Sequence, residues 1–408
     1  MQNQAAASTD LRTPGASAIA NPEEKLRRFN RRTLLKASAA GVVVLGGTGG
    51  LRAYDQGVFS TGEGPAYDPW RAWPPYVQRD GLAALVGAAI LAANPHNTQA
   101  WQFALSENRI EIHSDLNRAG GALDPFLREH MLGLGCALEN LDLAASANGY
   151  ASEVVYQFDP SDQGAVIGID LASSAPVTSE LYDAIPKRHT NRGPYRTDPL
   201  PSETLAALEG QLADIPDIGV QWFTTEEERA SFATLVIDAN DAIDQDDDQA
   251  DETRAWFRTS WDAVQKDRDG LTIDTGGMSP LIRVVGKMLP GRFVPMDIPE
   301  GPIKGTPAFG LLVSTDNTDR TQQINAGRAW QRLHLWATSQ GMAMQPVDSP
   351  LVRADRERSL GLTAEFGSRI NTLTRDGKRP LLSFRLGYPE RDAELAPRRS
   401  IESVIIEN

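Results

Sequence analysis

Two segments of the chain, 192 residues apart, share a pattern that limits the folds open to this sequence. Residues 141–150 (LDLAASANGY) align without gaps on residues 333–342 (LHLWATSQGM), with two leucines, an alanine and a glycine in common. Each segment ends an amphipathic helical pattern at a glycine, Gly149 or Gly341, and glycine adopts the left-handed conformation that ends helices at little cost. Because the shift is close to half the chain length, the repeat predicts two related halves.

The composition of the 408-residue chain is that of an ordinary globular protein, 41% apolar and 23% charged, and the length suits two domain-sized units. The net charge is −14, and residues 53–408 alone carry −19 because residues 1–52 are basic. No nucleic-acid partner is expected, since phosphate binding needs a basic face. The single cysteine, Cys136, allows no intrachain disulfide and no cysteine-built metal site, and no metal is expected.

Helical and strand patterns mix without regular alternation, which favours an α+β fold with antiparallel or mixed sheets flanked by helices. Alternating apolar residues predict a hairpin with strands at 101–105 and 110–112 around a turn at 106–108. Further helices are expected at 81–93, 129–148, 178–187 and 326–340, and further strands at 153–158, 220–224, 309–313 and 381–386.

The expected elements divide the chain into an amino-terminal segment (1–52), a first half (53–175) and a second half (176–408). An insertion at 238–305 interrupts the second half, and its aromatic residues Trp256, Phe257 and Trp261 predict an anchor on the body, either as plain core or as a lid over a site. The acidic run at 244–249 lacks the glycine and the closing glutamate of a calcium loop, so it is interpreted as a solvated helix face.

The amino-terminal segment carries a paired arginine ahead of a mildly apolar run. Residues 30–36 (NRRTLLK) resemble a twin-arginine (Tat) signal, and residues 37–51 are too short and weakly apolar to indicate a spanning helix. The resemblance implies the Tat export machinery as a partner and a periplasmic or other extracytoplasmic location. The alternative is a basic, flexible arm. No clear Ala-x-Ala site follows Leu51, so both cleavage and retention as a membrane tether stay open.

Several common catalytic motifs are absent from the sequence: the P-loop, G-x-G-x-x-G after a strand, H-E-x-x-H and G-x-S-x-G. Two polar clusters remain, at residues 94–103 (NPHNTQAWQF) and 187–195 (KRHTNRGPY). Taken alone, the first is typical of a turn before a hairpin and the second of a cationic helix end. In an acidic chain, however, a concentrated cationic turn indicates a fixed anion nearby.

The two clusters resemble the signature segments of nitroreductase-fold flavoproteins. Residues 95–101 (PHNTQAW) are similar to the segment P-x-[HT]-N-[TS]-Q-P-W, with Ala100 in place of proline, and residues 188–192 (RHTNR) are similar to R-[RH]-[ST]-x-[RK]. Their order, together with the Tat-like segment, resembles the Acg-type branch, in which the two subunits of a homodimer have become one chain. The resemblance spans residues 68–405 and implies a nitroreductase-like fold whose halves form a pseudo-dimer.

The resemblance also implies one FMN per chain, held where the halves meet. Arg188 is implied as a phosphate ligand together with Arg398 and Arg399, and guanidinium groups suit a phosphate dianion. Arg192 is implied as the catalytic cation at the N1–C2 edge of the ring, where reduction places negative charge, and His96 as a catalytic ring-edge donor. The other implied cofactor-binding residues are His189, Thr190, Pro95, Asn97, Thr98, Gln99, Gln345, Pro346, Val347 and Asp348.

Alternatives exist for several of these residues. Arg398 and Arg399 also fit a solvated basic tail, His96 also fits a structural hydrogen bonder, and residues 341–348 also fit a glycine-capped helix that runs into a buried strand. In the flavoprotein interpretation, backbone amides near Val347 and Asp348 face N5 of the flavin.

The activity implied by the resemblance is a two-electron, ping-pong transfer through FMN, from a small-molecule electron donor to a nitroaromatic or quinone-like acceptor. Export would separate the protein from nicotinamide dinucleotides, so the donor is either another molecule or the protein does not turn over conventionally. The alternative function is a flavin-sequestering protein whose lid covers the FMN. A scaffold that has lost its flavin is the third and least favoured interpretation.

Overall fold

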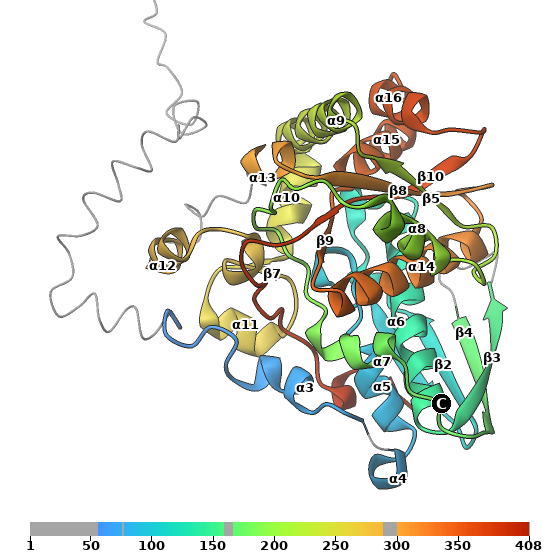
Figure 1. Cartoon of the computed structure of the whole chain (residues 1–408). Helices are drawn as coiled ribbons and strands as arrows, with labels where there is room; N and C mark the ends of the chain where they lie inside the picture. Colours follow the sequence, from blue (N-terminus) through green and yellow to red (C-terminus); the bar gives the residue numbers. More distant parts are fainter. Residues whose placement is uncertain (1–55, 76, 159–165, 289–299, 408) are drawn as a thin grey trace, which may run out of the picture. The chain divides into compact units, whose positions relative to one another are not determined.

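Two long helices, α6 (Arg128–Ala147) and α14 (Arg320–Ser339), pack against each other at the centre of the fold (Figure 1). Both have 20 residues, and they begin 192 positions apart, which is the shift of the repeated pattern. A Cβ at Gly135 would lie 2.0 Å from the carbonyl oxygen of Ile324, and a Cβ at Gly327 would lie 2.0 Å from that of Leu132. The contact is therefore reciprocal, as in an interface with two-fold symmetry, and the missing side chains let the backbones meet.

The computed structural model describes residues 56–75, 77–158, 166–288 and 300–407, all within one unit that spans residues 51–408. The Tat-like segment and the apolar run after it lie outside the described residues. Within them, no helix combines the length and apolar character needed to cross a membrane.

The first sheet has the strand order β11-β1-β2-β4-β3. It confirms the predicted hairpin, whereas β4 and β11 were not predicted. β11, at the carboxy terminus, pairs in parallel with β1 through Phe103 and Ile405, so the end of the second half completes the sheet of the first. The strands are β1 (Trp101–Leu105), β2 (Arg109–Ser114), β3 (Tyr150–Gln157), β4 (Val166–Ser173) and β11 (Ile405–Ile406).

The second sheet has the order β5-β8-β10-β9, which matches β1-β2-β4-β3 position by position. In both sheets the long helix follows the second strand and precedes the third in chain order. The α+β class with two sheets is confirmed. The three strands predicted for this half are present as β5, β8 and β10, and β9 is the buried strand that was the alternative for residues 341–348. The strands are β5 (Gly219–Phe223), β8 (Ala308–Ser314), β9 (Ala343–Pro346) and β10 (Arg379–Gly387).

The central helices lie between the two sheets, and a further helical layer covers the other face of the second sheet (Figure 1). Strand β8 shows why both faces of the second sheet are apolar. Phe309 and Leu311 belong to the core under the outer helices, whereas Ala308 and Leu312 belong to the core around the central helices. The outer helices are α9 (Glu226–Gln245), α15 (Ser349–Leu360) and α16 (Glu365–Leu373).

Short helices complete both halves, and the predicted helices at 81–93 and 178–187 are shorter than expected. Ser179 caps α7 by accepting a hydrogen bond from the N–H of Tyr182. The first-half and linking helices are α3 (Asp68–Arg71), α4 (Val77–Asp80), α5 (Ala83–Ala89), α7 (Glu180–Ala184) and α8 (Ser202–Gly210). The insertion contains α10 (Asp247–Ala255), β6 (Phe257–Arg258), α11 (Trp261–Asp267), β7 (Leu271–Thr272), α12 (Pro280–Met288) and α13 (Glu300–Lys304).

The acidic run at 244–249 is only in part the solvated helix face that its composition predicts: Asp244, Gln245, Asp247 and Asp248 are exposed, whereas Asp246 is half-buried and Gln249 is buried. Asp246 separates α9 from α10 and caps α10 by accepting from the N–H of Gln249 at 3.3 Å. Its carboxylate also forms ion pairs with Arg353 and Arg356 of α15, each at 3.0 Å. The run therefore fastens the insertion to the second half.

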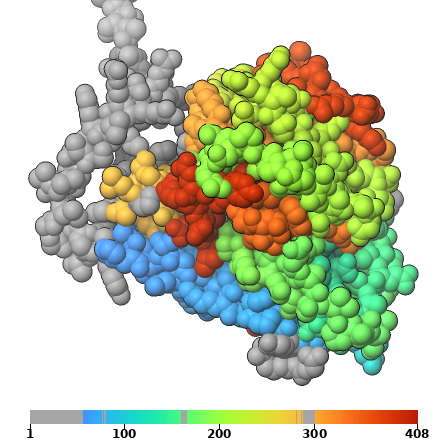
Figure 2. All heavy atoms as spheres, viewed as in Figure 1, coloured from blue at the N-terminus to red at the C-terminus, as the bar shows by residue number. Residues whose placement is uncertain are grey.

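The carboxy-terminal segment, red in Figure 2, reaches the surface between the blue start of the described chain and the gold part of the insertion. Trp70 Nε1 donates to the carbonyl of Ala396 at 2.7 Å, and the N–H of Arg398 donates to the carbonyl of Ala66 at 2.7 Å. Residues more than 300 positions apart are thereby joined next to the predicted site.

Candidate functional site

The first polar cluster folds into a short turn, η3 (Pro95–Asn97), that leads into β1. Its backbone is unusual, because His96, Asn97 and Gln99 have positive φ angles of 48°, 57° and 52°. Residues other than glycine rarely adopt this region, and those that do gather at functional sites, where surrounding contacts hold them. Here the side chain of Asn94 accepts a hydrogen bond from the N–H of Gln99 at 2.8 Å. The turn is thus strained and held by a residue at its own start.

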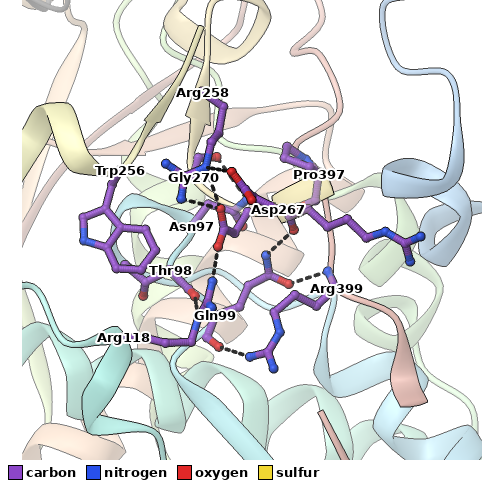
Figure 3. A network of polar contacts seen from close by, with 12 residues as sticks. Asn97, Thr98, Gln99, Arg118, Trp256, Arg258, Asp267, Gly270, Pro397 and Arg399 are labelled. Carbon is purple, nitrogen blue, oxygen red and sulfur yellow. Dashed lines mark hydrogen bonds and ion pairs between the residues drawn. The ribbon is translucent and has the colours of Figure 1, made fainter. Parts of the chain in front are cut away.

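The side chain of Asn97 connects this turn to two distant segments (Figure 3). Its Nδ2 donates to the carbonyls of Pro397 at 2.9 Å and Gly270 at 3.2 Å, and its Oδ1 accepts from Nη1 of Arg398. Both N–H groups of the amide are therefore used within the protein. The predicted contact of Asn97 with a ligand stays a prediction.

Gln99 makes a second connection between the same segments (Figure 3). Its Nε2 donates to the carbonyl of Arg268, and its Oε1 accepts from the N–H of Arg399, both at 2.8 Å. Arg399 also donates from Nη1 to the carbonyl of Gln99 at 3.2 Å and from Nη2 to that of Ser403 at 2.7 Å. The guanidinium of Arg399, predicted to bind phosphate, therefore links the turn to the chain end in this structure.

Two other arginines of the prediction meet in the interior: 2% of Arg188 and 3% of Arg398 is exposed. Nη2 of Arg188 donates to the carbonyl of Leu91 at 2.9 Å, and Nη2 of Arg398 donates to that of Ala92 at 3.2 Å. The ring of Trp70 lies against Arg398, 4.8 Å from centroid to guanidinium carbon. The Nε of each arginine is buried without a hydrogen-bond partner, and no carboxylate in the described part of the chain pairs with either.

The electrostatics of this arginine pair favour a bound anion. Burial lowers the pKa of Arg188 to about 10, and burial together with the charge of Arg188 holds the pKa of Arg398 well below its usual range. Burial and then Arg188 also lower the pKa of His189 to about 3 and that of His334 well below its ordinary value, so both histidines are neutral. Buried charge is costly unless it is paired, and a phosphate would pair it.

Arg192 and His96, the two residues predicted to be catalytic, lie in a second cationic region. Nη1 of Arg192 donates to the carbonyl of Thr275 at 3.2 Å. Burial above all, and then the charge of Arg385, lower the pKa of Arg192 to about 10. Burial and the charge of Arg192 lower the pKa of His96 to about 4. The imidazole is therefore neutral at pH 7 and offers an N–H rather than an imidazolium.

Proteins similar in sequence to this chain are found in Mycobacterium tuberculosis. No family model matches the chain. Rv3131 of Mycobacterium tuberculosis, whose name provisionally classes it as an NAD(P)H nitroreductase, is 26% identical over 325 residues, 78% of this chain and 88% of that protein. The similarly named acg protein of the same organism is 29% identical over 126 residues, 30% of this chain and 38% of that protein. The chain is similar to nitroreductases.

Among solved structures, the FMN-dependent nitroreductase NfnB of Mycobacterium smegmatis, solved with NADPH, covers 55% of this chain and 96% of its own. The identity is 18% and the TM-score is 0.32.

The nitroreductase-like loop after α14 begins beside Arg192. Oε1 of Gln345 accepts from Nε of Arg385 at 2.7 Å, and Pro346 pairs with Phe384 of β10. The N–H of Asn191 donates to the carbonyl of Met344 at 3.3 Å. Gln345 and Pro346 thus lie next to the loop that carries Arg192, and their contact with FMN stays a prediction.

Val347 and Asp348 lie further along and make other contacts. The N–H of Val347, predicted to face flavin N5, donates to the carbonyl of Ser383 at 2.9 Å and is used inside the sheet. The carboxylate of Asp348 accepts from Nη1 of Arg128 and from the N–H of Ser383, both at 2.7 Å. Glu129 is buried beside it, and burial, followed by the charge of Asp348, raises the pKa of Glu129 well above its usual range. That the backbone N–H of Asp348 faces the flavin ring stays a prediction.

Residues 268–277 of the insertion lie over both nitroreductase-like motifs. The N–H of Gly270 donates to the carbonyl of Asn97 at 3.0 Å, and the carbonyl of Thr275 accepts from Arg192. A Cβ at Gly277 would lie 2.3 Å from the carbonyl oxygen of Arg192, so the two backbones are in close contact. These contacts connect the insertion to both motifs, and the choice between plain core and lid stays a prediction.

The sequence motifs did not predict three residues of the site: Trp70, Arg118 and Arg385. Arg118 donates to the carbonyl of Thr98 at 2.6 Å and pairs with Asp269, which connects the insertion to the turn. A charged residue within the apolar strand pattern at 381–386 was a usable signal for Arg385, because buried charge is rare without a function. Of the predicted residues, Pro95 and Thr190 are half-buried in the two motifs.

Proposed function

We propose that this protein is an FMN-dependent oxidoreductase that carries out two-electron, ping-pong reduction of nitroaromatic or quinone-like acceptors. The observation that carries the proposal is the buried pair Arg188 and Arg398, which lacks a carboxylate partner among the described residues and has an unused Nε on each side chain. When bound, FMN supplies hydride-level redox chemistry that protein side chains lack.

The residues present fit FMN at two points. The pair Arg188 and Arg398 offers charge-assisted donors to a phosphate dianion. Arg192 offers a second fixed charge, without a carboxylate partner in the described chain, where the reduced ring gains negative charge. Neutral His96 beside it would donate a hydrogen bond to the ring edge. The chain's own contribution is to hold Arg188 and Arg398 in a dry interior and Arg192 in a half-buried position, where each charge is effective.

The fused-halves architecture supports one FMN per chain. Arg188 interacts with Cys136 of α6 and with His334 of α14. The positions 192 residues away are Arg328 and Asp142, and these form an ion pair at 2.9 Å. Glu139, only 1% exposed, binds Arg328 as well, so the equivalent position in the other half is filled by charged side chains. We infer a pseudo-dimer that kept one cofactor site.

FMN titration of the apoprotein tests the proposal. Arg188→Met and Arg398→Met should each weaken FMN binding by about 10- to 100-fold, the usual effect of losing a hydrogen bond to a charged group, and should abolish the preference for FMN over riboflavin. The same variants should raise the thermal stability of the apoprotein, because each removes an unpaired buried charge.

Arg229→Met is the matched control. Arg229 also donates to one carbonyl, that of Thr306, and also has an unpartnered Nε, but it lies on α9. The FMN affinity of Arg229→Met should equal that of the wild type. A wild-type protein that neither retains nor takes up FMN, or an Arg188→Met variant with wild-type affinity, would refute the proposal. Arg192→Ala should instead lower the reduction potential of the bound flavin.

A second candidate, a flavin-sequestering protein, is favoured by the contacts of residues 268–277 with both motifs. Gly270 has φ of 73°, and a Cβ there would lie 2.6 Å from the carbonyl oxygen of Trp256, so Gly270→Ala should loosen the lid. Gly301→Ala in the same insertion meets nothing within 4 Å and serves as the control. If the lid sequesters the flavin, NAD(P)H or a quinol should reduce the bound flavin faster in Gly270→Ala than in Gly301→Ala. An active enzyme with an open site should show equal rates in both variants.

We also propose that the protein is exported by the Tat machinery to the periplasm or another extracytoplasmic space, on the basis of residues 30–36. Export bears on the electron donor: the relatives' names specify NAD(P)H, whereas an exported enzyme needs a donor present outside the cytoplasm. Replacing both Arg31 and Arg32 with lysine should retain the full-length protein in the cytoplasm, as measured by fractionation. Unchanged export would contradict the signal.

A further inference from the structure

Arg385 is a completely buried arginine that none of the nitroreductase-like motifs includes. It comes from β10 and points to the loop that carries Arg192. Nη2 donates to the carbonyl of Gly193 at 2.7 Å and lies 3.5 Å from that of Asn191. These are the residues immediately before and after Arg192, so one guanidinium holds the backbone on both of its sides.

The remaining contacts of Arg385 fix its own orientation. Nε donates to Oε1 of Gln345 at 2.7 Å, and Nη1 donates to the carbonyl of Pro302 at 3.0 Å. Its planar face lies on the ring of Tyr195, with 3.9 Å between the guanidinium carbon and the ring centroid. Tyr195 in turn donates its hydroxyl to the carbonyl of Asn191 at 2.7 Å. The group is therefore rigid, and it joins three segments of the predicted site.

The charge of Arg385 is not neutralised. All its hydrogen-bond acceptors are carbonyl or amide oxygens, and no carboxylate of the described residues forms an ion pair with it. Burial is the main cause of the lowered pKa of Arg192, and the charge of Arg385 adds to it. A purely structural role could be filled without burying an unpaired charge, which costs stability. The unpaired buried charge of Arg385 therefore needs a functional explanation.

We propose that Arg385 is a positioning residue that holds the Arg192 loop in place and adds a second fixed positive charge behind it. The inference rests on the proposed function, because the charge acts on a flavin ring held at Arg192. A second cation favours the reduced, anionic ring over the oxidised ring, and it requires no movement during reduction.

The test measures the reduction potential of bound FMN in wild type, Arg385→Met, Arg385→Lys and the control Arg229→Met. Arg385→Met should lower the preference for reduced over oxidised FMN by about tenfold, within the usual range of coupling between two sites. Tenfold corresponds to about 30 mV for a two-electron couple. Arg385→Lys should restore most of this preference because it keeps the charge. A double variant with Arg192→Met should show less than the sum of the two single effects.

Hydrogen exchange of the apoprotein provides the readout that needs no flavin. The backbone amides of Asn191, Arg192, Gly193 and Tyr195 should exchange faster in Arg385→Met than in Arg229→Met, since the loop loses its support. If the variant binds FMN with an unchanged potential, or if the loop exchanges at the control rate, the assignment of Arg385 is overturned. If wild type fails to bind FMN, the proposed function falls, and the exchange result alone then decides whether Arg385 positions the loop.

Discussion

The close contact between α6 and α14 predicts that a single added methyl group lowers the stability of the protein. In Gly135→Ala the new Cβ would lie 2.0 Å from the carbonyl oxygen of Ile324 and 3.0 Å from the backbone nitrogen of Arg328, whereas ordinary contacts begin at 3.4 Å. Both obstacles are backbone atoms of α14, so no side chain can rotate away. The helices must separate locally by more than about 1 Å, in an interior that packs as densely as a crystal.

The expected cost follows from two opposing effects. Overpacking a core costs about 1–3 kcal/mol, and the upper end applies because the obstacle is a helix backbone. Alanine recovers about 1 kcal/mol through its higher helix propensity. The net loss in the free energy of unfolding should therefore be about 2 kcal/mol, measured by urea unfolding monitored through tryptophan fluorescence. FMN affinity should also fall, because Cys136 and His334, beside Arg188, lie on these two helices.

Gly210→Ala is the matched control, since Gly210 lies within α8 and a Cβ there meets nothing within 4 Å. That variant should be neutral or more stable by up to about 1 kcal/mol. The reciprocal variant Gly327→Ala should resemble Gly135→Ala, and the double variant should cost less than the sum, because one separation relieves both clashes. Equal stability of Gly135→Ala and Gly210→Ala would refute the close backbone contact.

Two further predictions concern pH. Burial raises the pKa of Glu129 well above its ordinary value of 4.5, so above pH 4.5 the folded protein binds a proton that the unfolded chain has lost. The stability of the protein should therefore decrease as the pH rises from about 5. In Glu129→Gln, the decrease in Tm measured up to pH 8 should be smaller. Asp246 behaves oppositely: burial works against ionisation, but hydrogen bonds from Arg356 and Arg353 prevail and lower its pKa from 3.8 to about 2. Its contribution should be complete above pH 4 and lost toward pH 2, so the Tm difference between wild type and Asp246→Asn should shrink over that interval. A constant difference would contradict the pairing.

The periodic segments of this protein were predictable because their side-chain pattern is local. The hairpin at 101–112 and the helix ends at Gly149 and Gly341 were expected from alternation and from glycine alone. Strand β4 was missed although its buried residues Ile167, Ile169 and Leu171 alternate, a local pattern that predicts a strand. The two-residue β11 was missed because its partner β1 lies 300 residues earlier in the chain.

The two polar clusters could likewise be recognised as a pair, since their residue types and order are written in the sequence. What the pattern could not decide was which atoms remain available to a ligand. Gln99 and Arg399 hydrogen-bond to each other, and Asn97 and Gln99 donate to the carbonyls of Gly270 and Arg268, whereas Arg188 and Arg398 are left with unused donors. This division depends on contacts across the whole chain.

The sequence by itself determined the helices, the repeat and the cationic residues, because each depends on neighbours within a few turns of chain. Only the tertiary structure decided that two arginines 210 positions apart share one dry interior, and that Arg385 supports a third. The physical reason is that desolvation and the pairing of charges are set by every group packed around a site, and those groups are distant in sequence.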